Sequence, residues 1–146
     1  MSRSFYIVVV GCGRLGSQVA GELSRRGHSV VVIDSDEAAF GQLPAEYGGF
    51  TLAGDATEHN LLSRAKAGEA DMLLATTGDD NVNLMVSQVA KRLFRVPRVI
   101  ARVFEPRRGA VYERLGISTV CPTVMAAESL LESVREDLPD NQREPS

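Results

Sequence analysis

The stretch Tyr6-Ile7-Val8-Val9-Val10-Gly11-Cys12-Gly13-Arg14-Leu15-Gly16 runs from an uncharged apolar segment directly into the pattern Gly-x-Gly-x-x-Gly. Residues 17–26 follow with apolar side chains at helical spacing, so the order is strand, glycine turn, helix. In a dinucleotide-binding loop of this order, Gly11 would turn the chain, Gly13 would let a phosphate approach the backbone, and Gly16 would let the helix pack against the strand. The phosphates would meet free N–H groups at the positive end of the helix dipole. The motif alone is a weak signal, because an ordinary strand-to-helix loop can have the same glycines.

A second apolar run, residues 29–33, follows a predicted helix end at Gly27-His28. Its composition, Ser-Val-Val-Val-Ile, is typical of a parallel strand buried on both faces. The run ends at Asp34, eighteen residues after Gly16, which is close to the roughly twenty-residue spacing of a ribose-binding acid. A carboxylate there accepts hydrogen bonds from both ribose hydroxyls and repels a 2′-phosphate. Together with the glycine loop, Asp34 favours a nucleotide site that does not take NADP.

The composition indicates a single globular domain. The 146 residues are 44% hydrophobic and 24% charged, and a chain of this length can bury a core of its own. The net charge of −3 argues against nucleic acid as the main partner. The apolar runs are too short for a membrane span or a signal peptide. Cys12 and Cys121 have neither metal-ligand spacing nor a disulfide pattern, so we expect no metal and a cytoplasmic location.

The rest of the chain repeats the alternation of strand and helix. We expect strands at 6–10, 29–33, 50–53, 72–75, 99–103 and 118–121, and helices at 17–26, 37–47, 58–67, 81–94, 106–115 and 123–136. This alternation predicts an α/β fold, namely a Rossmann-like, doubly wound sheet of six parallel strands with helices on both faces. We expect one nucleotide-binding domain over 1–136, and a disordered tail in the polar segment 137–146.

Polar loop residues follow the first four predicted strands. Because the carboxyl ends of parallel strands meet at one edge of a sheet, these residues would surround one crevice. Asp55 is suited to an adenine amino group, whereas Thr76 and Thr77 are suited to a phosphate or a second ribose. The full set of candidates is Gly11, Cys12, Gly13, Arg14, Leu15, Gly16, Asp34, Ser35, Gly54, Asp55, Ala56, Thr57, Thr76, Thr77 and Arg102.

Helix capping is the alternative role for several loop residues, because Asp and Thr after a strand are common N-caps. Asp36 has the position of an N-cap for the helix 37–47, and the ribose role goes to Asp34 because it directly follows the apolar run. Capping and ligand contact both remain open for Thr57 and Asp80. Asp55 precedes the cap position, so ligand contact is favoured there.

Two arginines could contact phosphate groups. Arg14 lies inside the glycine loop, where a guanidinium could bind a terminal phosphate with two parallel hydrogen bonds. Its alternative is a solvent-facing position in the first helical turn, which the helix dipole slightly disfavours. Arg102 ends the fifth strand at the same edge and is the weaker candidate, since it could instead pair with Glu105 or Asp80.

Several motifs occur in an order that resembles one family. They are Gly11-Cys12-Gly13-Arg14-Leu15-Gly16, Ile33-Asp34, Gly54-Asp55-Ala56-Thr57, Asp79-Asp80-Asn81-Val82-Asn83 and Ile100-Ala101-Arg102, followed by Tyr112-Glu113-Arg114-Leu115-Gly116-Ile117 and Cys121-Pro122. Over roughly residues 5–136 the chain is similar to the TrkA N-terminal domain, also called the RCK N-lobe. The resemblance implies a cytosolic regulatory subunit of potassium channels or transporters. Such proteins bind NAD(H), ATP or ADP at the Rossmann edge, with AMP a further candidate, and change ring or dimer geometry in response.

The resemblance also assigns roles by position. It implies phosphate binding by Gly11, Gly13, Arg14 and Gly16, ribose binding by Asp34, and contacts to adenine by residues 55–57. The variant Gly-x-Gly-Arg-x-Gly is similar to the ATP- and ADP-responsive, KtrA-like members, in which the arginine senses the terminal phosphate. Thr123 departs from the glutamate of that branch, so no metal is expected. The chain ends after the last predicted helix, so we expect no C-terminal RCK lobe.

A regulator of this family needs protein partners. The last predicted helix has a row of apolar residues at helical spacing, which could pack on the chain's own sheet or on a partner subunit; they are Val124, Ala127, Leu130, Leu131, Val134 and Leu138. From the resemblance we expect a homodimer or higher homo-oligomer. We also expect a membrane-embedded potassium transporter or channel partner of the TrkH or KtrB type. The chain would then lie at the inner face of the cell membrane without inserting into it.

The predicted function is nucleotide-sensing regulation of potassium uptake without catalysis. The alternative is a small NAD-dependent oxidoreductase, but such enzymes usually need a second domain or long insertions for their substrate. None of the three tyrosines is followed by a lysine four residues later, and Cys12 has no base beside it in the sequence. The absence of these parts disfavours an enzyme.

Overall fold

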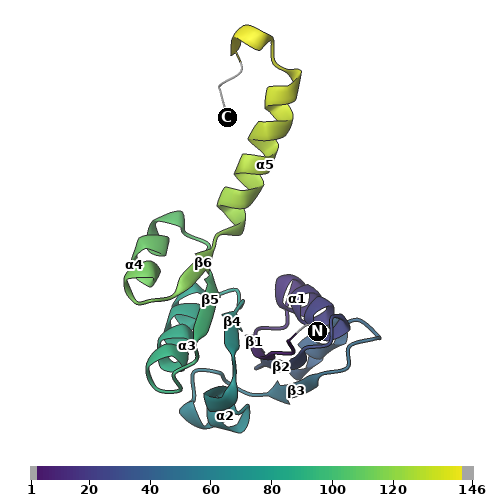
Figure 1. Cartoon of the computed structure of the whole chain (residues 1–146), viewed down its shortest axis with the longest axis vertical. Helices are drawn as coiled ribbons and strands as arrows, with labels where there is room; N and C mark the ends of the chain where they lie inside the picture. Colours follow the sequence, from purple (N-terminus) through teal and green to yellow (C-terminus); the bar gives the residue numbers. More distant parts are fainter. Residues whose placement is uncertain (1–2, 143–146) are drawn as a thin grey trace.

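Six parallel strands form one sheet in the order β3-β2-β1-β4-β5-β6. The computed structural model describes residues 3–142 (Figure 1). The strands are β1 (Tyr6–Val10), β2 (Ser29–Asp34), β3 (Phe50–Ala53), β4 (Met72–Ala75), β5 (Arg98–Arg102) and β6 (Ser118–Val120). The strand order turns back between β1 and β4, because the chain crosses from one edge strand to the centre after β3. The doubly wound parallel sheet predicted from the sequence is therefore confirmed.

Helices and short 3-10 segments connect the strands. They are α1 (Arg14–Arg25), η1 (Glu37–Gln42), α2 (His59–Arg64), η2 (Ala67–Glu69), α3 (Asp80–Arg92), η3 (Pro106–Arg108), α4 (Gly109–Arg114), α5 (Pro122–Asp137) and η4 (Asp140–Gln142). The helix predicted over 37–47 is only the 3-10 segment η1, since Pro44 forces extended backbone at Leu43. Its predicted cap is confirmed, because the Asp36 side chain accepts a hydrogen bond from the backbone N–H of Ala38.

Three other predicted elements differ in extent. α2 ends early, at a left-handed Lys66 (φ 59°), and the segment 106–115 begins as a 3-10 turn before α4. α5 continues to Asp137 and η4 covers Asp140–Gln142, so part of the predicted disordered tail has helical backbone. The remainder of that predicted tail, residues 143–146, lies outside the described residues.

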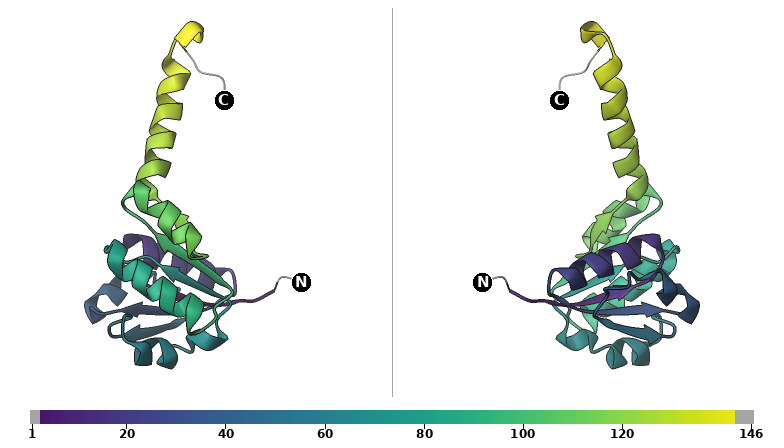
Figure 2. Two further views of the ribbon diagram at one scale, coloured as in Figure 1. Left: turned by 90° about the vertical axis from the view of Figure 1, so that its left-hand side faces the viewer. Right: turned by 90° about the vertical axis from the view of Figure 1, so that its right-hand side faces the viewer.

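The two faces of the sheet carry separate apolar clusters, because side chains alternate along each strand. Ile7 and Val9 of β1 pack on one face with residues of α1 and η1. Val8 and Val10 pack on the other face with residues of α2, α3 and α4. Figure 2 shows the same arrangement, with α1 on one side of the sheet and α3 on the other. The central strands are therefore buried on both faces, as their β-branched composition predicted.

α5 stands clear of the sheet and extends away from it (Figures 1 and 2). None of its residues is buried, although Leu130 and Leu131 are apolar and each is 68% exposed. The structure thus contradicts one of the two arrangements left open by the sequence, in which this helix packs on its own sheet. Within residues 3–142, no helix combines the length and apolar character needed to cross a bilayer.

Candidate functional site

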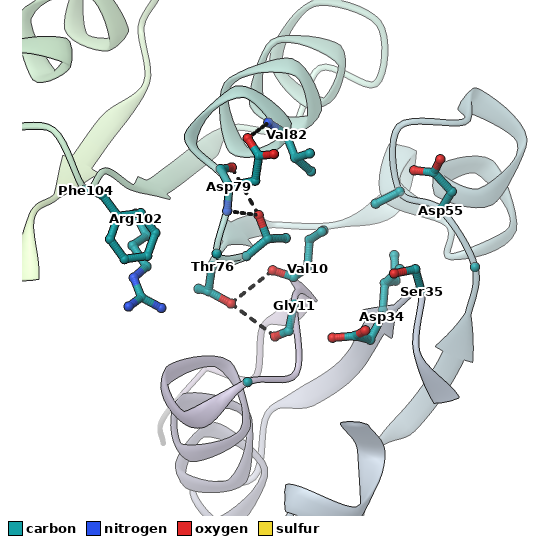
Figure 3. A pocket seen from close by; sticks show the side chains of 16 residues that line it. Val10, Gly11, Asp34, Ser35, Asp55, Thr76, Asp79, Val82, Arg102 and Phe104 are labelled. Carbon is teal, nitrogen blue, oxygen red and sulfur yellow. Dashed lines mark hydrogen bonds between the residues drawn. The ribbon is translucent and has the colours of Figure 1, made fainter. Parts of the chain in front are cut away.

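A crevice of about 580 Å³ opens where the strand order turns back, at the carboxyl ends of β1 to β5. This is the position at which doubly wound sheets bind ligands, and the volume suits a small molecule. Its walls come from the loops after the strands (Figure 3). The lining residues are Val10, Gly11, Gly13, Ile33, Asp34, Ser35, Gly54, Asp55, Ala56, Thr76, Thr77, Gly78, Asp79, Val82, Arg102 and Phe104.

Most of the predicted candidates line this crevice, but not all of them. The structure brings together Gly11, Gly13, Asp34, Ser35, Gly54, Asp55, Ala56, Thr76, Thr77 and Arg102. The lining does not include Cys12, Arg14, Leu15, Gly16 or Thr57. Cys12, Arg14, Leu15 and Gly16 lie in the glycine loop or at the start of α1, and Cys12 and Gly16 are buried there.

Two glycines of the loop are explained by the fold itself. Gly11 has φ +104°, and a Cβ on it would lie 2.9 Å from the backbone nitrogen of Thr77. A Cβ on Gly16 would lie 1.9 Å from the carbonyl oxygen of Gly11, so only glycine permits this contact between α1 and the loop.

Neither backbone conformation nor packing requires a glycine at position 13. Its backbone is in an ordinary extended conformation (φ −80°), and a Cβ on it would meet no atom within 4 Å. Gly78, on the loop after β4, also has open space around a hypothetical Cβ. Both glycines line the crevice, so their missing side chains leave room for a ligand beside the backbone.

Asp34 joins the glycine loop to the end of β2. Its Oδ2 accepts a hydrogen bond from the backbone N–H of Cys12 at 2.8 Å, and its Oδ1 accepts one from Asp36 at 2.8 Å. A carboxylate has about four lone-pair positions, so roughly two stay open for further donors. The side chain lines the crevice, so ribose hydroxyls could supply these donors.

Cys12 lies behind the loop, in the apolar cluster under α1, and is fully buried. Burial, and secondly the charge of Asp34, raise the pKa of its thiol. A neutral, inaccessible thiol is not a nucleophile, so Cys12 is a packing residue.

Arg14 does not lie at the crevice in the single chain. Its exposed side chain lines a separate depression on the outer side of α1, together with Gln18 and Glu46. Arg14 is the first residue of α1 and is absent from the crevice lining, so its predicted contact with a phosphate stays a prediction.

The loop after β4 is held by its own hydrogen bonds. The buried Thr76 hydroxyl donates to the carbonyl oxygens of Val10 (3.0 Å) and Gly11 (3.1 Å), as drawn in Figure 3. The Thr77 hydroxyl donates to Asn83 Oδ1 at 2.6 Å. Asp79 caps α3, accepting from the backbone of residues 81 and 82. These hydroxyls fix the wall of the crevice rather than pointing freely into it.

Asp80 has neither of the two roles considered for it. Its carboxylate accepts hydrogen bonds from the backbone N–H groups of Phe104 (2.8 Å) and Glu105 (3.2 Å). The first turn of α3 thereby holds the chain that follows β5. Asp79, one residue earlier, is the cap.

Arg102 and Phe104 form the wall opposite Asp34 and Asp55 (Figure 3). The guanidinium carbon lies 4.2 Å from the Phe104 ring centroid, a cation–π contact. Arg102 Nε is buried and has no hydrogen-bond partner among the described residues. The ion pairs considered for Arg102, with Glu105 or Asp80, are not formed in residues 3–142. Phe104 was missed from the sequence, where its only signal is an aromatic side chain two residues after Arg102.

Asp55 and Thr57 form a local turn at the other end of the crevice. The backbone N–H and the hydroxyl of Thr57 both donate to Asp55 Oδ1, at 2.9 and 2.6 Å. Both hydrogen bonds lower the pKa of the Asp55 carboxyl, and the bond from the Thr57 hydroxyl has the larger effect. Thr57 is not the cap of α2, whose N-cap residue is Glu58, so its role is to hold Asp55.

Within the described residues, no group of three or more His, Cys, Asp or Glu side chains is placed to hold a metal ion.

The model of the TrkA-N domain family matches residues 7–123. The chain is 40% identical over 126 residues to the "Trk system potassium uptake protein TrkA" of Streptomyces coelicolor, covering 86% of this chain and 56% of that protein. It thus spans little more than half the length of that relative.

Among solved structures, the RCK domain of GsuK superposes with a TM-score of 0.75 at 25% identity, covering 88% of this chain and 28% of that one. A Shewanella denitrificans Kef C-terminal domain in AMP-bound form shares the fold, with a TM-score of 0.76 at 24% identity over 92% of this chain and 83% of that one.

The hydroxyl of Thr57 should control the ionisation of Asp55. In Thr57→Val, the loss of that hydrogen bond should raise the pKa of Asp55 toward its ordinary value of 3.8. The side-chain carboxyl resonance of Asp55, followed by NMR against pH, measures this. Thr51→Val, on the edge strand β3, is the control and should leave the pKa of Asp55 unchanged. An unshifted Asp55 titration in Thr57→Val would contradict the assignment.

Proposed function

Because this chain belongs to the TrkA-N domain family, we propose that it is the nucleotide-sensing domain of a regulatory protein of potassium uptake. The relative from Streptomyces coelicolor is named for that system. The partner in this proposal is a membrane-embedded potassium transporter or channel subunit of the TrkH or KtrB type. The domain would act at the inner face of the cell membrane and respond to NAD(H), ATP, ADP or AMP in its crevice.

The observation that carries the nucleotide proposal is the open space at Gly13. Gly11 and Gly16 are required by backbone conformation and packing, but nothing in the fold requires a glycine at position 13. A phosphate beside the N-terminus of α1 supplies the reason, because it approaches the backbone where a Cβ would otherwise project. This accounts for the one glycine of the motif that folding leaves unexplained.

The two ends of the crevice suit the two ends of a nucleotide. Asp34 and Asp55 at one end offer acceptors for ribose hydroxyls and an adenine amino group. Arg102 at the other end offers guanidinium N–H donors without a competing ion pair among the described residues, which favours phosphate. In this proposal Arg102, rather than Arg14, is the arginine that contacts phosphate within one chain.

The proposed role is regulatory rather than catalytic. The lining contains no histidine or cysteine, and the hydroxyls of Thr76 and Thr77 are engaged in hydrogen bonds within the crevice wall. Asp34 at the ribose position disfavours the 2′-phosphate of NADP by charge repulsion.

A thermal-shift panel with NAD, NADH, NADP, ATP, ADP and AMP tests the nucleotide site. AMP belongs in the panel because the Kef domain, which has the same fold, was solved with it. A ligand at about one hundred times its dissociation constant stabilises a protein by ~2.7 kcal/mol, which raises the unfolding midpoint by several degrees. We expect stabilisation by at least one adenine nucleotide and none by NADP. No shift with any of them would contradict the proposal.

Gly13→Ala should remove nucleotide binding without harming the fold. The new methyl group would project into open space at an ordinary backbone conformation, so the free energy of unfolding should change by no more than about 1 kcal/mol. The nucleotide-induced shift of the midpoint should disappear. Gly41→Ala is the matched control, because Gly41 also has open space but does not line the crevice. Retained binding in Gly13→Ala would show that the open space is not a phosphate position.

We further propose that α5 joins two copies of the chain. Its apolar row, including Leu130, Leu131 and Val134, is exposed, and no part of the described chain covers it. The adjoining end of the sheet is open as well, since Val120 of β6 is exposed beside Arg102 of β5. A second copy would bury both surfaces, and burial of apolar area favours association by about 25 cal/mol per Å².

The double substitution Leu130→Glu and Leu131→Glu should therefore convert a dimer or higher oligomer into a monomer. Both side chains are exposed in the single chain, so each substitution should change the free energy of unfolding of the monomer by no more than about 0.5 kcal/mol. Solution mass from light scattering during gel filtration measures the outcome. Phe50→Glu, equally exposed but on the opposite edge strand, is the control. A monomeric unsubstituted chain would contradict this part of the proposal.

A further inference from the structure

Asn83, in the first turns of α3, is fully buried and lies directly behind the crevice. Its Nδ2 donates to the carbonyl oxygens of Thr77 (3.0 Å) and Arg102 (3.1 Å). Its Oδ1 accepts from the backbone N–H of Thr77 (3.0 Å) and from the Thr77 hydroxyl (2.6 Å). The side chain itself does not line the crevice.

These four bonds use the whole hydrogen-bonding capacity of an asparagine side chain, which has two N–H donors and one oxygen with two lone pairs. A buried amide with every partner in place specifies one geometry, because any shift of the surrounding backbone leaves a polar atom unsatisfied. Among the described residues, the partners lie only at Thr77 and Arg102.

Both partners line the crevice, and they come from different strands. Thr77 follows β4 and stands beside Gly78, whereas Arg102 ends β5 and stacks on Phe104. β4 and β5 pair only as far as Ala75 and Ala101, so beyond that pair the amide of Asn83 links the two walls. Asp80, three residues earlier, supports the same wall by holding the backbone of Phe104.

We infer that Asn83 is a positioning residue for the phosphate end of the bound nucleotide. It acts through the backbone of Thr77 and Arg102, and the inference rests on the proposed nucleotide site. The adenosine end is held separately, since Asp34 bonds to Cys12 and Asp36, and Asp55 bonds to Thr57. A change at Asn83 thus affects phosphate recognition and leaves recognition of adenosine intact.

The substitution Asn83→Asp tests this separation. Aspartate keeps the size and the acceptor for Thr77, but it places an oxygen against the carbonyls of Thr77 and Arg102, to which Asn83 donates. The dissociation constant of ADP should rise by at least about tenfold, whereas that of adenosine should change by less than about twofold. Calorimetric titration of ADP, with adenosine as competitor, measures both dissociation constants. The titration is run at a temperature well below the unfolding midpoint.

A core substitution far from the crevice is the matched control. Val96 is buried in the loop before β5, at the amino end of the sheet. Val96→Ala should lower the unfolding midpoint and leave the ratio of the ADP and adenosine constants as it is in the unsubstituted chain. If Asn83→Asp does not fold, Asn83→Ser replaces it, because a serine hydroxyl cannot reach both carbonyls and should give the same split.

A loss confined to ADP in either Asn83 variant supports the inference. Equal losses for ADP and adenosine, or no loss, overturn it while leaving the nucleotide site itself in place. If the thermal-shift panel shows another adenine nucleotide binding in place of ADP, that nucleotide is titrated instead. If the unsubstituted chain binds no nucleotide of the panel, the proposed site fails, and the inference fails with it.

Discussion

The contact between the start of α1 and the loop after β1 is the constraint on which the rest of this structure depends. It brings the carbonyl oxygen of Gly11 so close to Gly16 that no side chain fits between them. The contact aims the N-terminus of α1 at the edge of the sheet where the strand order turns back. The crevice and the hydrogen bond from Cys12 to Asp34 both follow from this placement.

The fold was predictable because its signals are local and repeated. Uncharged β-branched runs alternate with helical segments, and a parallel sheet covered by helices accommodates that order. The shorter connections were less predictable, since a proline at position 44 and a left-handed residue at position 66 ended segments that looked helical. The free position of α5 could not be predicted, because an apolar row has the same periodicity whether it packs on its own sheet or remains exposed.

The site was predictable as a set of loops but not as a set of side-chain roles. Arg14 was a predicted phosphate ligand, yet in the single chain it lines a depression apart from the crevice. Capping or ligand contact was left open for Asp80 and Thr57, yet Asp80 holds the chain after β5 and Thr57 holds Asp55 in its own turn. The position of Phe104 in the crevice wall was not predicted, because it depends on the path of the chain after β5. Sequence spacing gives the order of groups along the chain, whereas these roles are decided by contacts between loops.

The exposure of α5 has a mechanical consequence. In the single chain, α5 has no buried residues along its length. Its direction is therefore set only at its base, where Pro122 follows β6. β6 pairs with β5, the strand that ends at Arg102 in the crevice wall. At 1.5 Å per residue, the sixteen residues of α5 make a lever about 24 Å long, so a rotation of about 10° at its base moves its tip by ~4 Å. A small movement of the crevice wall would therefore produce a larger displacement at the far end of α5.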